Sequence, residues 1–187
     1  MLTEFQKKKL THFFRLLDQD GNGCLQLEDF SDIAERLRME FGFSYESKEN
    51  KFLVDRCVNF FHKFLTNIKH SEGQTISLQE WLEYADKRLV APGEENEVNL
   101  DEFVEFMVGF FVDLFDENHD GYISTDEYAD LFLIYKIDIK YSAKSFINLD
   151  INKDGRLSRT ELLYAFETFV TSDDPKLKGN WIFGQWD

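Results

Sequence analysis

The apolar residues of this chain recur mostly three and four positions apart, which is the period of an amphipathic helix. Three polar stretches of twelve residues interrupt the pattern, and each is flanked in the same way. The apolar positions before the three stretches are Leu17, Phe14 and Phe13; Phe115, Val112 and Phe111; and Leu149 and Phe146. Those after them are Phe30, Ile33 and Ala34; Tyr128, Leu131 and Phe132; and Leu162, Ala165 and Phe166. The pattern predicts an all-α fold with a helix on each side of each polar stretch.

The polar stretches themselves share one arrangement of residue types. They are DQDGNGCLQLED (18–29), DENHDGYISTDE (116–127) and DINKDGRLSRTE (150–161). Each has side-chain oxygens at positions 1, 3 and 5, glycine at position 6, an aliphatic residue at position 8 and an acid at position 12. Ca²⁺ takes about six to eight oxygen ligands, and glycine permits the sharp turn that brings alternate residues around the ion. We interpret all three stretches as EF-hand calcium loops.

The ligands follow from the loop positions. Positions 1, 3 and 5 supply side-chain oxygens, position 7 a backbone carbonyl and position 12 a carboxylate that binds through both oxygens. The predicted ligands of the loops 116–127 and 150–161 are Asp116, Asn118, Asp120, Tyr122 and Glu127, and Asp150, Asn152, Asp154, Arg156 and Glu161. Those of the loop 18–29 are Asp18, Asp20, Asn22, Cys24 and Asp29.

The first loop departs from the other two at position 12, where Asp29 replaces glutamate. Aspartate is one methylene shorter and reaches the ion less easily with both oxygens. Loss of one oxygen moves the coordination number from seven toward six, which suits octahedral Mg²⁺. We therefore expect three Ca²⁺ sites, with Mg²⁺ possible above all at the first.

A fourth helix-loop-helix unit is recognised by the apolar positions of its flanking helices rather than by metal ligands. EF-hands usually occur in pairs, so the loop at 18 needs a partner. The stretch KHSEGQTISLQE (69–80) has the same apolar frame, and Ser77 and Glu80 form a capping-box pattern for the next helix. Its ligand positions fail, since Lys69 stands at position 1 and Gly73 at position 5. We predict a degenerate EF-hand that binds no metal.

The four units define the predicted organisation: two lobes of paired EF-hands with a C-terminal docking tail. The N-terminal pair occupies residues 1–90, the C-terminal pair 91–175 and the aromatic tail 176–187. The segment VAPGEEN (90–96) contains one of only two prolines and marks the boundary. An aromatic tail is unusual for a disordered end, so we expect it to dock on a lobe.

Composition narrows the function classes. A net charge of −15 disfavours nucleic acid and anionic membranes as partners. Two cysteines imply no disulfide framework, the first ten residues are too polar for a secretory signal, and no apolar run is long enough to span a bilayer. No catalytic motif stands out. We predict a cytoplasmic, monomeric protein that is not an enzyme and whose main partner is the calcium ion.

The ensemble resembles the sarcoplasmic calcium-binding protein family, including the calexcitins, over the whole chain. The resemblance rests on active loops one, three and four, a degenerate second loop after a long gap, and a C-terminal segment. That family often closes its first loop with aspartate, as at Asp29. The tail is similar to a calexcitin-type ending at Gly179, Asn180, Trp181, Phe183 and Gly184. The resemblance implies a compact four-EF-hand fold whose tail packs near the N-terminal lobe.

Three functions are compatible with these patterns. A Ca²⁺ buffer, exchanging with Mg²⁺, fits Asp29 and the low content of three methionines, because sensors of the calmodulin type expose Met-rich grooves. A calexcitin-like sensor would release its aromatic tail to engage a target protein. A carrier of an apolar ligand is the third, since coelenterazine-binding proteins and cnidarian photoproteins share this pattern of active loops. Photoproteins end in proline, however, and this chain ends in Asp187.

Overall fold

The computed structural model describes residues 1–69, 74–90 and 100–185. The α-helices in these ranges are α1 (Glu4–Leu17), α2 (Leu27–Glu40), α3 (Lys48–Lys69), α4 (Leu78–Tyr84), α5 (Leu100–Phe115), α6 (Thr125–Ile134), α7 (Ser142–Leu149) and α8 (Arg159–Thr171). Shorter helical turns are η1 (Ala85–Val90), η2 (Ile139–Tyr141) and η3 (Lys178–Trp181), and the strands are β1 (Cys24–Leu25), β2 (Ile76–Ser77), β3 (Tyr122–Ile123) and β4 (Leu157–Ser158). The prediction of an all-α fold is confirmed.

The two short antiparallel ribbons pair the loops. β1 pairs with β2 and places Leu25 opposite Ile76, while β3 pairs with β4 and places Ile123 opposite Leu157. These four residues occupy position 8 of their loops, and each is fully buried. The stretch 69–80 is therefore the structural partner of the first loop, as predicted from the helical frame.

Capping residues set where several helices begin. Thr3 and Gln6 form a capping box at α1, and Ser77 and Glu80 form the predicted one at α4. Each box satisfies backbone N–H groups that lack a partner inside the helix. In α6 and α8 the position-12 glutamate of the calcium loop is also the third helical residue of the box. Loop closure and helix initiation therefore use the same side chain there.

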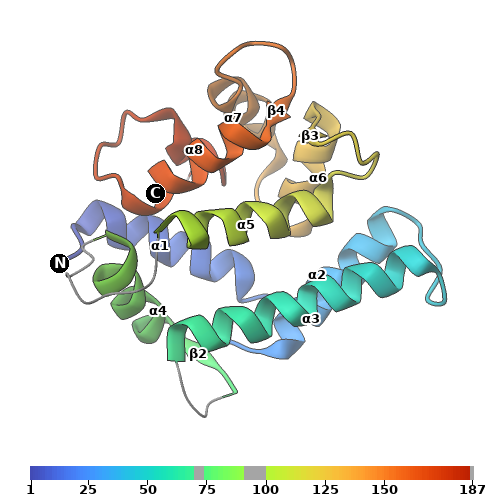
Figure 1. Ribbon diagram of the computed structural model, residues 1–187, viewed down its shortest axis with the longest axis horizontal. Coiled ribbons are helices and arrows are strands. Elements are labelled where there is room, and N and C mark those ends of the chain that lie inside the picture. The colour runs from blue at the N-terminus through green and yellow to red at the C-terminus, as the bar shows by residue number, and fades with distance from the viewer. Residues whose placement is uncertain (70–73, 91–99, 186–187) are drawn as a thin grey trace.

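The two pairs of hands share one connected hydrophobic core. Figure 1 shows α5 running through the middle of the molecule, with α8 on one side and the α2–α3 pair on the other. Phe60 of α3 stacks on Phe110 of α5 with ring centroids 3.8 Å apart. Burial of an aromatic side chain of this size contributes about 1.5–3 kcal/mol, so contacts across this seam join the two pairs energetically.

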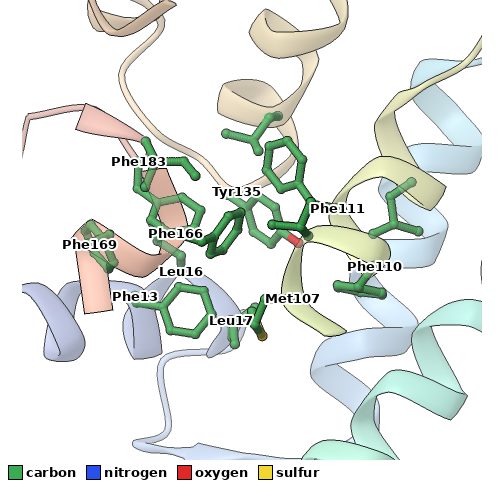
Figure 2. Close-up of a cluster of buried hydrophobic side chains, with 14 of the residues drawn as sticks. Phe13, Leu16, Leu17, Met107, Phe110, Phe111, Tyr135, Phe166, Phe169 and Phe183 are labelled. Atoms are coloured by element: carbon green, nitrogen blue, oxygen red, sulfur yellow. The ribbon is translucent and has the colours of Figure 1, made fainter. Parts of the chain in front are cut away.

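The C-terminal tail is part of this core, which confirms the expected docking. Figure 2 shows Phe183 beside Phe166 and Phe169 of α8, with Phe13 of α1 nearby. The ring of Phe183 lies 5.3 Å from that of Phe13 and 5.1 Å from that of Phe169. The tail thus contacts α1 of the first hand and also the C-terminal pair, so its position is not confined to the N-terminal lobe.

Some predictions concern residues outside the described ranges. These are the failed ligand position Gly73, the boundary at 91–96 and the last two residues of the tail, 186–187. Every helix in the described part of the chain is too short or too polar to cross a membrane.

Candidate metal centres

The first five positions of each candidate loop form the same hydrogen-bond pattern. In the third loop the Asp116 carboxylate accepts from the backbone N–H of Asp120 at 3.1 Å and of Gly121 at 3.0 Å. Asn118 Oδ1 accepts from Asp120 N at 2.8 Å, and Asp120 Oδ1 accepts from Tyr122 N at 2.9 Å. These bonds turn the side-chain oxygens of positions 1, 3 and 5 toward one side of the loop.

The fourth loop repeats this pattern. Asp150 accepts from the N–H groups of Asp154 and Gly155, Asn152 Oδ1 accepts from Asp154 N at 2.9 Å, and Asp154 Oδ1 accepts from Arg156 N at 3.2 Å. The glycine at position 6 has a φ near +80° in both loops, where a side chain would be strained. Two sequences that differ at half of their positions therefore reach one loop conformation.

The position-12 glutamates close these loops. Glu127 Oε1 accepts from the N–H of Glu117 at 3.0 Å, and Glu127 Oε2 accepts from the N–H of Ser124 at 2.8 Å. Glu161 joins Ile151 and Ser158 of the fourth loop in the same way. Each carboxylate thus spans both ends of its loop, with its two oxygens positioned for a bidentate ligand.

Asp29 closes the first loop in the same manner despite its shorter side chain. Asp29 Oδ1 accepts from Gln19 N at 2.8 Å, and Oδ2 accepts from Gln26 N at 2.9 Å. Carboxylate oxygens of Asp18, Asp20 and Asp29 all lie within 4.8 Å of one another. The first loop therefore brings three carboxylates together, with Asp20 at the position where the other two loops have asparagine.

The hydrogen bonds of positions 1 to 7 of the first loop match those of the other two loops. Asp18 accepts from the N–H groups of Asn22 at 3.1 Å and Gly23 at 2.9 Å. Asn22 Oδ1 accepts from the N–H of Cys24, the residue at position 7, at 2.8 Å. The Cys24 thiol is free and half-buried. The structure thus groups Asp18, Asp20 and Asp29, and hydrogen bonds connect Asn22 to Asp20 and Cys24 to Asn22.

The first and last ligand of each loop are buried acids. Their exposed fractions lie between 1% and 9%, and the residues are Asp18, Asp29, Asp116, Glu127, Asp150 and Glu161. Among the described residues none of these six carboxylates pairs with a lysine or arginine. Buried carboxylates without a cationic partner are costly unless a cation is supplied. A hard divalent cation at the loop centre fits this donor set.

Burial affects the closing acids differently. Desolvation raises the pKa of Asp29, and hydrogen bonds from Gln26, Gln19 and Asp20 only partly offset it. Desolvation acts on Glu161 too, but hydrogen bonds from Ser158 and from the far side of its loop outweigh it, so its pKa is lowered. The fourth loop therefore stabilises its charged closing acid through its own hydrogen bonds, and the first loop does so less completely.

Position 7 links the paired loops of the C-terminal half. The guanidinium of Arg156 lies 3.7 Å from the ring centroid of Tyr122, and its Nε is 3.5 Å from Asp154 Oδ2. Stacking of a cation on an aromatic face contributes about 0.5–1 kcal/mol at an exposed site. The contact joins the two residues whose backbone carbonyls are predicted ligands of neighbouring loops.

Two lysines with structural roles were not singled out in the sequence. Lys9 is fully buried beneath the tail, and Lys136 reaches the first loop from the segment after α6. Lys9 lies on the apolar stripe of α1 together with Phe13 and Leu17, and that position is a signal of burial. Nothing local marks Lys136, because its partner is 117 residues away.

Family comparisons agree with the loop assignments. An EF-hand domain-pair model matches residues 1–37, and an EF-hand model matches residues 113–133 and 143–163. Calerythrin from Saccharopolyspora erythraea is 24% identical over 169 residues, covering 90% of this chain and 94% of that protein. The sarcoplasmic calcium-binding protein of Perinereis vancaurica tetradentata is 28% identical over 125 residues, covering 67% of this chain and 66% of that protein.

Solved structures show the same fold. The coelenterazine-binding protein from Renilla muelleri superposes with a TM-score of 0.77 at 22% identity, covering 98% of this chain and 99% of that one. A sarcoplasmic calcium-binding protein from amphioxus gives a TM-score of 0.75 at 17% identity and covers all of both chains. Fold and loops together define an EF-hand protein. Within that class, the curated proteins that it resembles are calerythrin and a sarcoplasmic calcium-binding protein.

Proposed function

We propose that this protein binds Ca²⁺ at the loops 18–29, 116–127 and 150–161, and that the stretch 69–80 binds none. The observation that carries the proposal is the closing carboxylate, which spans both ends of each of the three loops and is buried with no cationic partner among the described residues. The ion would be held by the residues named above for each loop. Its charge would neutralise acids that the fold has desolvated.

The proposed role is a cytosolic buffer that exchanges Ca²⁺ with Mg²⁺. Two features support this role over that of a sensor. Asp29 is one methylene shorter than the glutamate of the other loops, and loss of one oxygen ligand favours six-coordinate Mg²⁺. The core between the hands contains stacked phenylalanines together with the buried Met107, whereas adaptable binding grooves are rich in methionine. We also propose that the protein is a monomer, which sedimentation equilibrium would test.

Calorimetric Ca²⁺ titration with and without millimolar Mg²⁺ tests the buffer role. A buffer is expected to bind three ions with dissociation constants near ~10⁻⁹–10⁻⁸ M, weakened by Mg²⁺ competition. Sites near ~10⁻⁷–10⁻⁵ M that are indifferent to Mg²⁺ would instead favour a sensor. Fewer than three ions would contradict the assignment of the loops.

One contact favours a sensor as the second candidate. Tyr128 directly follows the closing Glu127, and its hydroxyl donates to the Ile182 carbonyl of the tail at 2.8 Å. A shift of α6 on metal binding would therefore pull on the tail. In that case the fluorescence of Trp181 should change on Ca²⁺ binding, and deletion of residues 176–187 should abolish target binding. An unchanged emission spectrum would argue against tail release.

An apolar-ligand carrier is the third candidate. Tyr84 is buried among aromatic rings, and its hydroxyl has no hydrogen-bond partner among the described residues. That hydroxyl would meet a polar atom of a ligand bound between the hands. Copurification of a chromophore or lipid with the protein would support this function, and mass spectrometry that finds only the polypeptide would oppose it.

A further inference from the structure

Two cationic side chains, one from the first hand and one from the segment after the third, each donate a hydrogen bond to a backbone carbonyl of the other hand. Lys136, which follows α6, donates from its Nζ to the Gln19 carbonyl of the first loop at 3.0 Å. Arg36 of α2 donates from Nη1 to the carbonyl of Ile134, the last residue of α6, at 3.3 Å. Helix α2 follows the first loop and helix α6 follows the third. The two hydrogen bonds therefore connect the helix after each of these loops to the other hand.

Lys136 makes this contact from a backbone conformation that lysine rarely adopts. Its φ is +58°, and Ile137 N donates to Phe132 O at 2.8 Å across it, which is the bonding of a glycine-type helix terminus. Glycine would be less strained at this position. The hydrogen bond of the lysine side chain to Gln19 therefore explains why a lysine stands here, whereas the backbone conformation does not.

Gln19 connects Lys136 to the closing acid of the first loop, Asp29. It occupies position 2 of the first loop, and its N–H donates to Asp29 Oδ1 while its carbonyl accepts from Lys136. Its side chain is anchored as well, since Nε2 donates to Leu16 O at 2.6 Å. The closing carboxylate and the lysine therefore hold opposite ends of a single residue. No corresponding cation contacts position 2 of the other loops, Glu117 or Ile151, in the described part of the chain.

We propose that Lys136 is a positioning residue of the first metal site, supplied by the C-terminal pair of hands. It holds Gln19 so that the loop stays closed enough for the short Asp29 side chain to reach the ion. Mg²⁺ requires near-ideal octahedral geometry, so it depends on this closure more than Ca²⁺ does. The inference rests on the proposed metal binding of the first loop.

The test uses the full chain with Glu127→Gln and Glu161→Gln, so that the first site is titrated alone with Mg²⁺ and with Ca²⁺. Three variants are compared in this background. Lys136→Gly removes the ammonium and relieves the backbone, Lys136→Arg keeps a cation, and Lys140→Gly removes the same charge from the same connection at a residue that pairs with Asp138 instead. Urea unfolding of each metal-free variant is measured alongside.

Lys136→Gly is expected to weaken Mg²⁺ binding at the first site about threefold to tenfold, because it removes one charged hydrogen bond at an exposed position. Ca²⁺ binding should weaken less, Lys136→Arg should restore most of the affinity, and Lys140→Gly should leave it unchanged. The metal-free Lys136→Gly protein should be no less stable than its parent. This combination separates positioning from general damage to the fold.

Two results would count against different claims. If the parent binds neither ion at the first loop, the proposed function fails there and the inference falls with it. If the parent binds Mg²⁺ and Lys136→Gly binds it equally well, the role of Lys136 is overturned while the metal site stands.

Discussion

Lys9 and Asn180 lie 171 positions apart and are joined by a hydrogen bond of 3.0 Å from Lys9 Nζ to Asn180 Oδ1. The same ammonium donates to the carbonyls of Thr168 and Ser172 at the end of α8. Lys9 has no exposed surface, so one buried cation connects α1, α8 and the tail. The partners are neutral oxygens, and this has a consequence for the pH dependence of stability.

Lys9 should make the protein more stable as the pH rises from about 8 to 10.5. Burial lowers the pKa of Lys9 from 10.5 to about 8, although Asp173 partly opposes the shift. In this window the unfolded chain holds a proton that the folded chain has lost, so the free energy of unfolding rises with pH. The wild type should gain up to about 3 kcal/mol relative to Lys9→Met across the window.

Urea unfolding in saturating Ca²⁺ at several pH values measures this difference. Lys8→Met removes an exposed lysine from the same helix and serves as the control. A constant difference between wild type and Lys9→Met at all pH values would show that the Lys9 ammonium is not desolvated.

Glu161→Gln should disable the fourth site without unfolding the protein. The amide keeps the size of the side chain but replaces one charged oxygen with a donor, which faces the N–H groups that Glu161 now accepts from. Ca²⁺ affinity at this site should fall by roughly 10–100-fold or more. Calorimetric titration should show one fewer tight ion, whereas Glu167→Gln on the exposed side of α8 should retain the wild-type number.

Asp29→Glu should change the ion preference of the first site. The added methylene lets the carboxylate bind with both oxygens and removes the need for a tightly closed loop. The ratio of Ca²⁺ to Mg²⁺ affinity at this site should rise by about tenfold, equivalent to roughly 1.4 kcal/mol. Competition titrations of the variant and the wild type decide this, and an unchanged ratio would show that Asp29 does not set the selectivity.

Two glycine substitutions should have opposite effects on stability. A Cβ at Gly179 would lie 2.7 Å from Thr168 Cβ and 3.0 Å from the backbone of Ala165, so Gly179→Ala should destabilise the docked tail by about 1–3 kcal/mol. A Cβ at Gly109 of α5 meets nothing within 4 Å, and alanine there should add about 1 kcal/mol. Equal unfolding midpoints for the two variants would mean that the tail does not pack closely on α8.

The repeated loop pattern could be predicted because its causes are local. The ligands of an EF-hand loop, including the closing acid at position 12, lie within twelve consecutive residues. The types and spacing of Asp116, Gly121 and Glu127 therefore predict the loop geometry. The degenerate partner could be predicted for a related reason. The apolar frame around Ile76 repeats that around Leu25, and the ribbon pairs the two residues.

The sequence by itself therefore determined the helices, the three candidate loops and the pairing of the hands. Only the tertiary structure decided which long-range contacts join them: the buried Lys9 beneath the tail, the single core across Phe60 and Phe110, and Lys136 on the first loop. Helical periodicity and loop spacing report interactions over a few residues. A contact between residues fifty or more positions apart leaves no periodic pattern in the sequence, because it depends on how the helices pack against one another.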